Sequence, residues 1–295
     1  MKGERGFILV LVLVILSIIT ALTVEFSYGL FATTSNLKNW TEAQRLSLIA
    51  SSGIRLASTA IKEQARIYRY TYPEKAEMVI EKIVDDFAGK VSLQVEDEGG
   101  KINLNALIMR NQRLNRDVYN SLKRLLTVLK LDQDIADRIV DWIDVDSEPR
   151  IRDSEEDAKN SYFDSIDELL LVRGIDRETY DKLVPYVTVH GTIDRLNINI
   201  NTASIPVIMS LSDDMTDEMA ASIVRQRRFK PFEGTDDPDL TALLGPLKTK
   251  LMGKIDVKSN FFRVTSVAEE EGIKRVIDSV LEIRGDVIVR YWKEY

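Results

Sequence analysis

The stretch MKGERGFILVLVLVILSIITALTVEFS, residues 1–27, begins with a short charged segment and continues at once into an apolar run. A helix over residues 7–24 rises about 27 Å, close to the ~30 Å thickness of the hydrocarbon core of a bilayer. The run is longer than the apolar core of a secretory signal peptide, and no A-x-A cleavage site follows it. The sequence therefore predicts a membrane-spanning helix that the mature protein keeps.

The charges around this run predict its orientation. Lys2 and Arg5 precede the run, and Glu25 follows it. Because basic residues favour the cytoplasmic side, we expect a single-pass protein with a cytoplasmic N-terminus and the rest of the chain on the other side of the membrane.

Helical periodicity continues beyond the predicted span. Apolar residues recur at spacings of three and four up to Pro73, which predicts one helix of about 60 residues; they are Leu37, Trp40, Ala43, Leu46, Ala50, Ile54, Ala57 and Ile61. A single apolar stripe requires a covering surface. That surface is either a partner protein, with Leu37, Trp40, Leu46 and Ile54 as candidate contacts, or a sheet of the same chain.

The remaining pattern predicts an α+β fold. Residues 74–89 read as a helix ended by Gly89, residues 90–107 as a hairpin turning at 97–100, and residues 260–295 as three antiparallel strands. Helical periodicity dominates between these β segments. We expect an antiparallel sheet packed on the long N-terminal helix, with a large all-α domain inserted into it.

Composition excludes several classes of function. The chain has a net charge of −7, which disfavours a general nucleic-acid binder. It has no Cys, and its single histidine, His190, reads as a turn residue. No phosphate-binding glycine loop, nucleophile elbow or metalloprotease helix occurs in the sequence. We therefore expect a protein that is not an enzyme.

An acidic segment at 132–157 is a candidate calcium site. Asp144, Asp146 and Glu148 alternate like the first ligands of a calcium loop, and Glu155 stands where the closing ligand would lie. Pro149 replaces the usual central glycine, so a looser site of oxygen ligands is expected, to which we add Asp141. The alternative is a solvated acidic face that caps helices. In a second acidic stretch, Asp213 and Asp214 are expected to cap the helix that follows them.

The start of the chain resembles the type IV prepilins, in which a basic leader ending in Gly precedes Phe and a long apolar helix. The resemblance implies that a prepilin peptidase cuts between Gly6 and Phe7 and leaves the helix in place. The fifth residue after the cut is usually Glu in that class, where it pairs with the N-terminal amine of a neighbouring subunit. Leu11 occupies this position here, which suits a subunit with no predecessor.

The body of the chain adds an ordered set of motifs. They are GKINLNAL, IVDWIDVDSEPR, FDSIDELLLVRGIDRETYDKLVPYVTV and LNININTAS. Together with the prepilin start, they resemble the minor pseudopilin K family of type II secretion systems. The resemblance implies an assembly role at the tip of a periplasmic pseudopilus, with calcium bound and with I- and J-type minor pseudopilins and the inner-membrane secretion platform as partners.

The resemblance also implies a division of the chain into domains. We expect a cleaved leader at 1–6, a transmembrane part at 7–24, a pilin-like helix with the first strands at 25–105, an inserted helical domain at 106–254 and final strands at 255–295.

A rival interpretation is a membrane-tethered DNA-binding protein. Two segments of the inserted domain resemble helix-hairpin-helix (SAM-like) repeats, which bind phosphates through the amides of a glycine-rich turn. In the first segment only Gly174 remains, followed by Asp176, and in the second the turn is Ser212-Asp213-Asp214. A basic spot lies beyond that turn, formed by Arg225, Arg227, Arg228 and Lys230. Acidic turns disfavour phosphate, so we expect no nucleic-acid partner.

Overall fold

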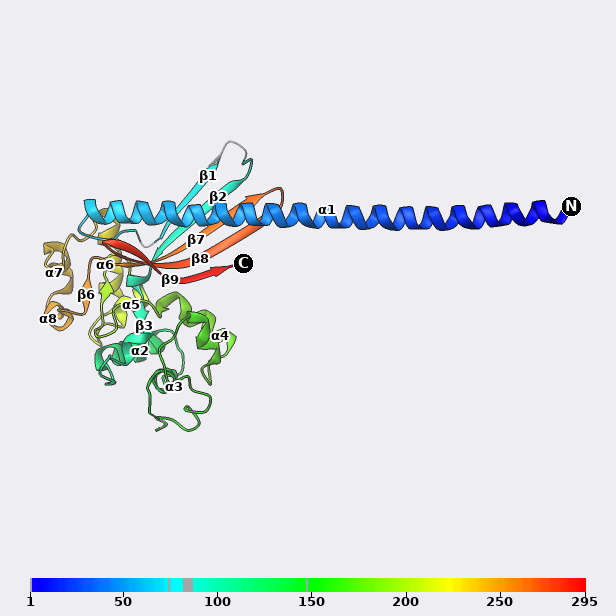
Figure 1. Cartoon of the computed structure of the whole chain (residues 1–295). Coiled ribbons are helices and arrows are strands. Elements are labelled where there is room, and N and C mark those ends of the chain that lie inside the picture. Colours follow the sequence, from blue (N-terminus) through cyan, green and yellow to red (C-terminus); the bar gives the residue numbers. More distant parts are fainter. Residues whose placement is uncertain (1, 74, 82–86, 147) are drawn as a thin grey trace.

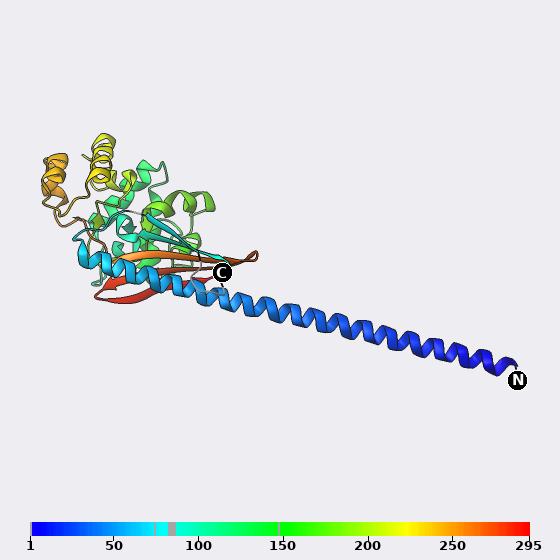
Figure 2. The same ribbon diagram turned by 90° about the horizontal axis from the view of Figure 1, so that it is seen from above.

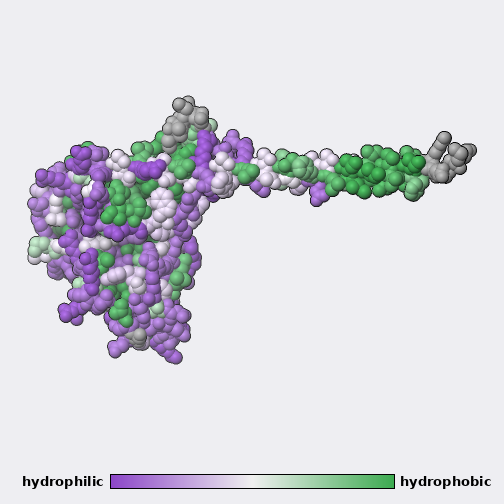
Figure 3. All heavy atoms as spheres, viewed as in Figure 1, coloured by the Kyte–Doolittle hydropathy of each residue, from purple (hydrophilic) through white to green (hydrophobic). Residues whose placement is uncertain are grey.

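One continuous helix carries the N-terminal part of the chain. The computed structural model describes residues 2–73, 75–81, 87–146 and 148–295. Helix α1 runs from Lys2 to Ile67 and projects far beyond the rest of the molecule (Figure 1). Its projecting half carries the apolar run, which forms a hydrophobic band separated from the hydrophilic body (Figure 3). The prediction of one long helix is confirmed.

An antiparallel sheet packs against the C-terminal half of α1. Its strand order is β1-β2-β7-β8-β9, and all neighbouring pairs are antiparallel. The strands are β1 (Lys75–Glu81), β2 (Lys90–Asp97), β7 (Phe261–Glu270), β8 (Ile273–Arg284) and β9 (Asp286–Glu294). The last three strands were predicted. Chain reversals fall at Glu271-Gly272 and at Gly285, all of which have positive φ.

The covering surface of the α1 stripe is the protein's own sheet. Leu46 and Ile54 are buried in an apolar core with residues of β2, β7 and β8. Leu37 and Trp40 remain 60% and 64% exposed. Of the four candidate partner contacts, only these two are accessible.

The helix predicted at 74–89 is wrong. Residues 75–81 form edge strand β1, paired with β2 along its whole length, while residues 74 and 82–86 lie outside the described part of the chain. Ala76, Met78 and Ile80 are apolar at every second position, so the segment fits the two-residue period of a strand as well as the period of a helix. The strand forms because the segment pairs with β2 and because Ile80 packs on the apolar core under α1.

The hairpin predicted at 90–107 is also wrong. β2 ends at Asp97, whose side chain caps a 3₁₀ turn, η1 (Glu98–Gly100). The chain then leaves the sheet, and β3 (Ile102–Asn103) pairs in parallel with β4 (Val187–Thr188) instead of returning along β2. After the buried Asp97 cap, the chain therefore does not turn back along β2 but passes from the sheet to the β3–β4 pair.

A helical body fills the space on the other side of the sheet (Figure 2). Its apolar core runs from Ile102 to Val257 and is separate from the core under α1. It also contains two short parallel strand pairs, so it is not strictly all-α; the second pair is β5 (Ile198–Asn199) with β6 (Ile255–Asp256). The domain boundaries and the helix-hairpin-helix likeness stay predictions. The α-helices are α2 (Arg116–Val128), α3 (Asp134–Ile143), α4 (Arg177–Leu183), α5 (Ile205–Met209), α6 (Asp217–Phe229), α7 (Pro238–Leu244) and α8 (Leu247–Leu251), and the remaining 3₁₀ turns are η2 (Leu104–Leu107), η3 (Ile166–Leu171) and η4 (Val184–Tyr186).

Candidate functional site

Three carboxylates meet at the C-terminal end of α3. Asp141 lies in the last turn of the helix, Asp144 is its C-cap residue, and Glu155 comes from the loop that follows. One oxygen of each lies within 4.8 Å of the others. Side-chain oxygens at this separation could coordinate one divalent cation such as calcium.

Only part of this cluster is neutralised by the protein. The amide of Arg150 donates to Asp141 Oδ2 at 2.9 Å, and the Ser154 hydroxyl donates to the same oxygen. Arg150 Nε lies 3.2 Å from Asp141 Oδ1, and its Nη2 lies 3.7 Å from Asp144 Oδ2. Even so, Asp141 Oδ1, Asp144 Oδ1 and Glu155 Oε1 are buried with no hydrogen-bond partner among the described residues. Buried oxygens without hydrogen-bond partners are more typical of a cation site than of an acidic face that is simply solvated.

The pKa values of the cluster report the same excess of negative charge. Burial, with the charges of Asp146 and Asp141, raises the pKa of Asp144 to about 6. Burial, with the charges of Asp141, Asp144 and Asp146, raises the pKa of Glu155 to about 7. A bound cation would relieve both shifts, because it stabilises the ionised forms.

The other two predicted ligands lie outside the group. Asp146 and Glu148 are exposed, and Asp146 Oδ1 accepts a hydrogen bond from the Glu148 amide at 2.9 Å. Asp146 is near enough to raise the pKa of Asp144. The structure thus brings together Asp141, Asp144 and Glu155, but not in the order of an EF-hand loop.

Two asparagines of the sequence motifs, Asn105 and Asn201, connect loops that are distant in the sequence by hydrogen bonds to their backbones. The Asn105 side chain donates to the carbonyls of Phe163 and Val189 and accepts from the Phe163 amide. In the same way, Asn201 donates to the Phe232 carbonyl at 2.8 Å and accepts from its amide at 2.9 Å. Both asparagines are buried. The GKINLNAL and LNININTAS motifs therefore stabilise the helical body.

Asp97 ties the sheet to the helical body. Its Oδ2 accepts hydrogen bonds from Asn199, Thr202 and Ser259 at 2.6–2.8 Å, and its Oδ1 accepts from the Gly99 amide at 2.8 Å. Burial nevertheless raises the pKa of this carboxyl. The point where the chain passes from the sheet into the helical body is thus fixed by one carboxylate that accepts hydrogen bonds at both oxygens.

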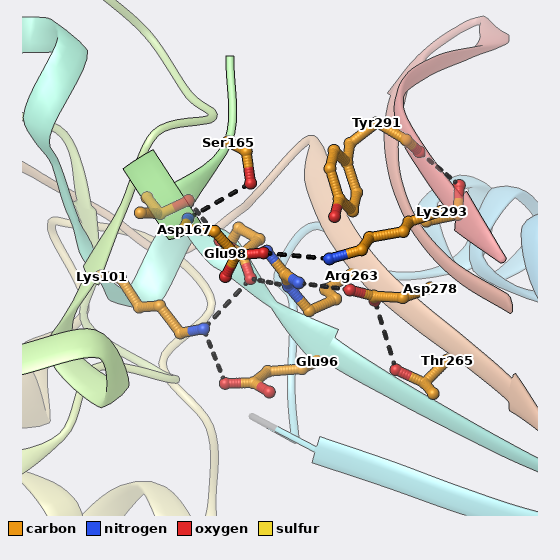
Figure 4. Close-up of polar contacts among 12 residues, drawn as sticks. Glu96, Glu98, Lys101, Ser165, Asp167, Arg263, Thr265, Asp278, Tyr291 and Lys293 are labelled. Atoms are coloured by element: carbon orange, nitrogen blue, oxygen red, sulfur yellow. Dashed lines mark hydrogen bonds and ion pairs between the residues drawn. The ribbon is translucent and has the colours of Figure 1, made fainter. Parts of the chain in front are cut away.

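A charged junction continues from this crossing between the sheet and the body (Figure 4). Glu98 Oε1 lies 3.1 Å from Lys101 Nζ and 3.3 Å from Arg263 Nε, and Thr188 donates to Glu98 Oε2. Arg263 Nη1 lies 2.6 Å from Asp278 Oδ2 on β8. Burial alone would raise the pKa of Glu98, but the charges of Lys101 and Arg263 lower it to about 2.

A second contact closes the outer side of the junction. Lys293 of β9 lies 3.3 Å from Asp167 Oδ2, and the Tyr180 hydroxyl donates to Asp167 Oδ1 at 2.7 Å. A cavity of about 320 Å³ lies between the two parts, lined by charged residues that include Lys75 and Glu96. Polar interfaces of this kind set an orientation less firmly than apolar ones. The roles of Glu98 and Arg263 could not be predicted from the sequence, because EDEGG reads as a turn and an alternating strand does not reveal which residues its side chains will meet.

The basic spot weighed for DNA binding loses one of its four residues in the fold, and the other three are exposed. Arg227 is buried and donates to the carbonyls of Ile200 and Ala203 at 2.7 and 2.6 Å. Asp213 and Asp214 do not cap α6, whose N-cap is Thr216, so that expectation is wrong. They pair with Arg124 and Lys250 instead, at 2.6 and 2.5 Å.

The proposed processing site lies within α1. The helix is continuous through Gly6 and Phe7, and Phe7 is 71% exposed.

The single histidine, His190, is half-buried. The centroid of its ring lies 6.3 Å from that of Tyr291, and its backbone amide donates a hydrogen bond to the Thr188 hydroxyl.

The chain is similar in sequence to known proteins of one family. Two family models, both described as type II secretion system protein K, match residues 100–192 and 198–258, just over half of the chain. Protein K of Pseudomonas aeruginosa is 25% identical over 98% of this chain and 92% of its own length. Protein K of Dickeya chrysanthemi is 32% identical over 48% of this chain and 44% of its own.

A solved structure shares the fold. It is the GspK–GspI–GspJ complex of the enterotoxigenic Escherichia coli type 2 secretion system, of which one chain matches with a TM-score of 0.72 at 22% identity. The match covers 88% of this chain and 99% of the solved one.

Proposed function

The chain belongs to the protein K family of type II secretion systems, and from this premise we propose that it is the minor pseudopilin at the tip of the pseudopilus. It acts by assembly, not by catalysis. It initiates or caps the pseudopilus that drives protein export across the outer membrane.

One observation carries the tip position. The helical body lies beside the sheet at the end of α1 farthest from the N-terminus (Figure 1). A pilin-like subunit stacked beyond this chain would meet that body, which supports a position with no subunit above it. Leu11 supports the same position, because a first subunit has no preceding amine for a Glu to neutralise.

The membrane segment has two roles in this proposal. Residues 7–24 hold the chain in the inner membrane, with the sheet and helical body in the periplasm. Prepilin peptidase removes residues 1–6 by cutting between Gly6 and Phe7, and the secretion platform then receives the mature helix.

The proposed partners are I- and J-type minor pseudopilins, and no nucleic acid is involved. The solved relative is a complex of GspK with GspI and GspJ. Leu37 and Trp40 supply exposed apolar contacts on α1 outside the membrane. The helix-hairpin-helix-like segments serve as scaffold in this interpretation, since Asp176 in the first caps α4 and the acids in the turn of the second are paired with Arg124 and Lys250.

Calcium is the proposed cofactor. Asp141, Asp144 and Glu155 would hold it, with Asp146 and Glu148 close by in the same loop. The ion supplies positive charge to three buried oxygens that lack hydrogen-bond partners among the described residues. The ion would thereby connect Glu155 of the loop to Asp141 and Asp144 at the end of α3. The shape of this end of the helical body would then depend on calcium.

The mature N-terminus tests the proposal. Mass spectrometry of the full chain, produced with its prepilin peptidase, should find a chain that begins at Phe7. Gly6→Val should retain Met1, whereas Gly3→Val, in the same leader, should be processed normally. A wild-type chain that keeps Met1, or is cut after Ala21, would contradict the prepilin interpretation.

A further inference from the structure

Edge strand β1 exposes a row of free backbone groups. It forms the edge of the sheet opposite β9, and its only strand neighbour among the described residues is β2 (Figure 1). No backbone hydrogen bond from any other described segment reaches residues 75–81. The strand contains no proline, and it pairs with β2 over all 7 residues without a shift of register. An edge strand of this kind accepts a further strand unless something covers or interrupts it.

An apolar groove runs beside β1 on the face of the sheet that carries α1. Met78 lies on this face, because it stands opposite Leu93, which is buried in the core under α1. α1 packs on β8, β7 and β2, and presents the small side chains of Ala57 and Ala60 to a groove of about 160 Å³ along β1. Leu56 and Met78 line it and are 50% and 55% exposed. An apolar cavity of about 150 Å³ holds a molecule as large as benzene, so the groove has room for an apolar side chain.

The other face of β1 is acidic. Glu77 and Glu81 are exposed, and neither forms a salt bridge with the described residues. The lysines that adjoin them pair with other acids, Lys75 with Glu96 and Lys90 with Glu269, each at 3.5 Å. Two free carboxylates four residues apart on one face of a strand favour a neighbouring strand with basic side chains at the same spacing.

These three features together specify the occupant. Free backbone groups at a sheet edge require an extended strand, since the backbone of a helix satisfies its own hydrogen bonds. The groove requires apolar side chains on one face of that strand, and the two glutamates favour basic side chains on the other. A second copy of this chain fits poorly, because pairing two β1 strands would bring four glutamates together.

We propose that β1 binds an extended strand of a partner protein, in which apolar residues facing the groove alternate with residues that include Lys or Arg opposite Glu77 and Glu81. The added strand runs antiparallel to β1, as all neighbouring pairs of this sheet do. Strand addition derives affinity from backbone hydrogen bonds and specificity from alternate side chains. The surface is separate from Leu37 and Trp40, and the inference does not depend on the proposed function.

Peptide binding tests the proposal. A fluorescent peptide of sequence Lys-Val-Thr-Leu-Lys-Val-Glu, antiparallel to β1, places its lysines opposite Glu81 and Glu77 and its leucine opposite Met78. The control peptide, Glu-Val-Thr-Leu-Glu-Val-Lys, has the same apolar residues and exchanged charges. Fluorescence anisotropy with the full chain in lipid nanodiscs should show at least about tenfold tighter binding of the first peptide, because in the control like charges replace opposite charges across the strands.

Exchanging the charges on the protein should exchange the preference. The double variant Glu77→Lys with Glu81→Lys should bind the control peptide at least about tenfold more tightly than the first peptide, and this gain also shows that the variant is folded. Asp286→Lys with Glu294→Lys is the matched control, because it makes the same change of net charge at exposed positions of the opposite edge strand β9. It should keep the preference of the wild type.

Two further measurements locate the contact. Successive N–H groups of a strand point to opposite edges, so N-methylation of every second residue blocks one edge of the peptide only. Of the two alternating patterns of N-methylation, one should abolish binding and the other should preserve it. Hydrogen exchange followed by mass spectrometry should show slower exchange of residues 75–81 when the first peptide is present, with unchanged exchange in β9.

Each other result overturns the inference. Equal affinity for both peptides, including no binding of either, or a preference that the Glu77 and Glu81 variant retains, would mean that these carboxylates select no partner. Binding that survives both patterns of N-methylation would mean that the occupant is not a strand. Slow exchange of residues 75–81 in the free chain that is lost on dilution would mean that a second copy of the chain covers β1.

Discussion

At the scale of single residues, the carboxylates of Asp141, Asp144 and Glu155 combine proximity with incomplete neutralisation. Arg150 supplies one positive charge to the cluster, and one oxygen of each acid is buried without a hydrogen bond from the described residues. Such an arrangement is unfavourable when all three acids are ionised. A divalent cation would make the arrangement favourable, so binding of the proposed calcium would be coupled to folding.

The first prediction separates ligands from neighbours. Glu155→Gln should weaken calcium binding at least about tenfold, since it removes a charged oxygen ligand. Glu148→Gln is the control, because Glu148 is exposed and outside the group. Isothermal titration calorimetry of the two variants measures the difference. Equal affinity in both, matching the wild type, would mean that the cluster is a solvated acidic face.

The second prediction concerns pH. Asp144 and Glu155 have folded-state pKa values of about 6 and 7, above their ordinary values of 3.8 and 4.5. Raised pKa values in acids mean that the calcium-free fold binds more protons than the unfolded chain, so its stability falls as pH rises from about 4 to 7. Added calcium should therefore raise the melting temperature strongly at pH 8 and weakly at pH 5. Thermal unfolding with calcium or with a chelator measures both values, and an effect that does not depend on pH would contradict this account.

At the scale of elements, the junction between the sheet and the helical body depends on charges. Glu98 is almost fully buried and is held by Lys101 and Arg263. The apolar cores on the two sides do not merge, and a charged cavity lies between them. The position of the body over the sheet thus rests on Asp97 at the crossing and on this network beside it.

The third prediction tests the junction. Arg263→Met leaves the buried Glu98 and the partly buried Asp278 without their shared partner, and should lower the free energy of unfolding by about 3 kcal/mol. Arg284→Met, on the neighbouring strand, removes a contact of a 57% exposed side chain and should cost less than about 1 kcal/mol. Urea unfolding of the two variants measures the difference. If both cost the same, the junction does not depend on Arg263.

The elements also show how far the sequence could be interpreted. The long helix and the last three strands followed from apolar period and turn glycines, which are local signals. β1 and the end of β2 did not, because the pairing of Met78 with Leu93 and the capping by Asp97 depend on distant residues. At the candidate site, spacing identified the acidic loop, but only the fold selects Glu155 and sets aside Asp146 and Glu148.

At the scale of the whole molecule, three parts serve one position in an assembly. The projecting half of α1 is apolar and suits a membrane (Figure 3). The sheet covers the other half of α1 and leaves β9 open beside it. The helical body lies at the far end, where a further subunit would have to stack. A subunit built in this way can receive neighbours along its side but not beyond its end.

The most direct test of this account is the native mass of the complex that contains the full chain. The chain is coproduced with the other pseudopilins of its system, extracted in detergent and measured by native mass spectrometry. The account predicts a complex with one copy of this chain and one or more different pseudopilins. A chain that remains alone, or that polymerises with itself, would contradict it.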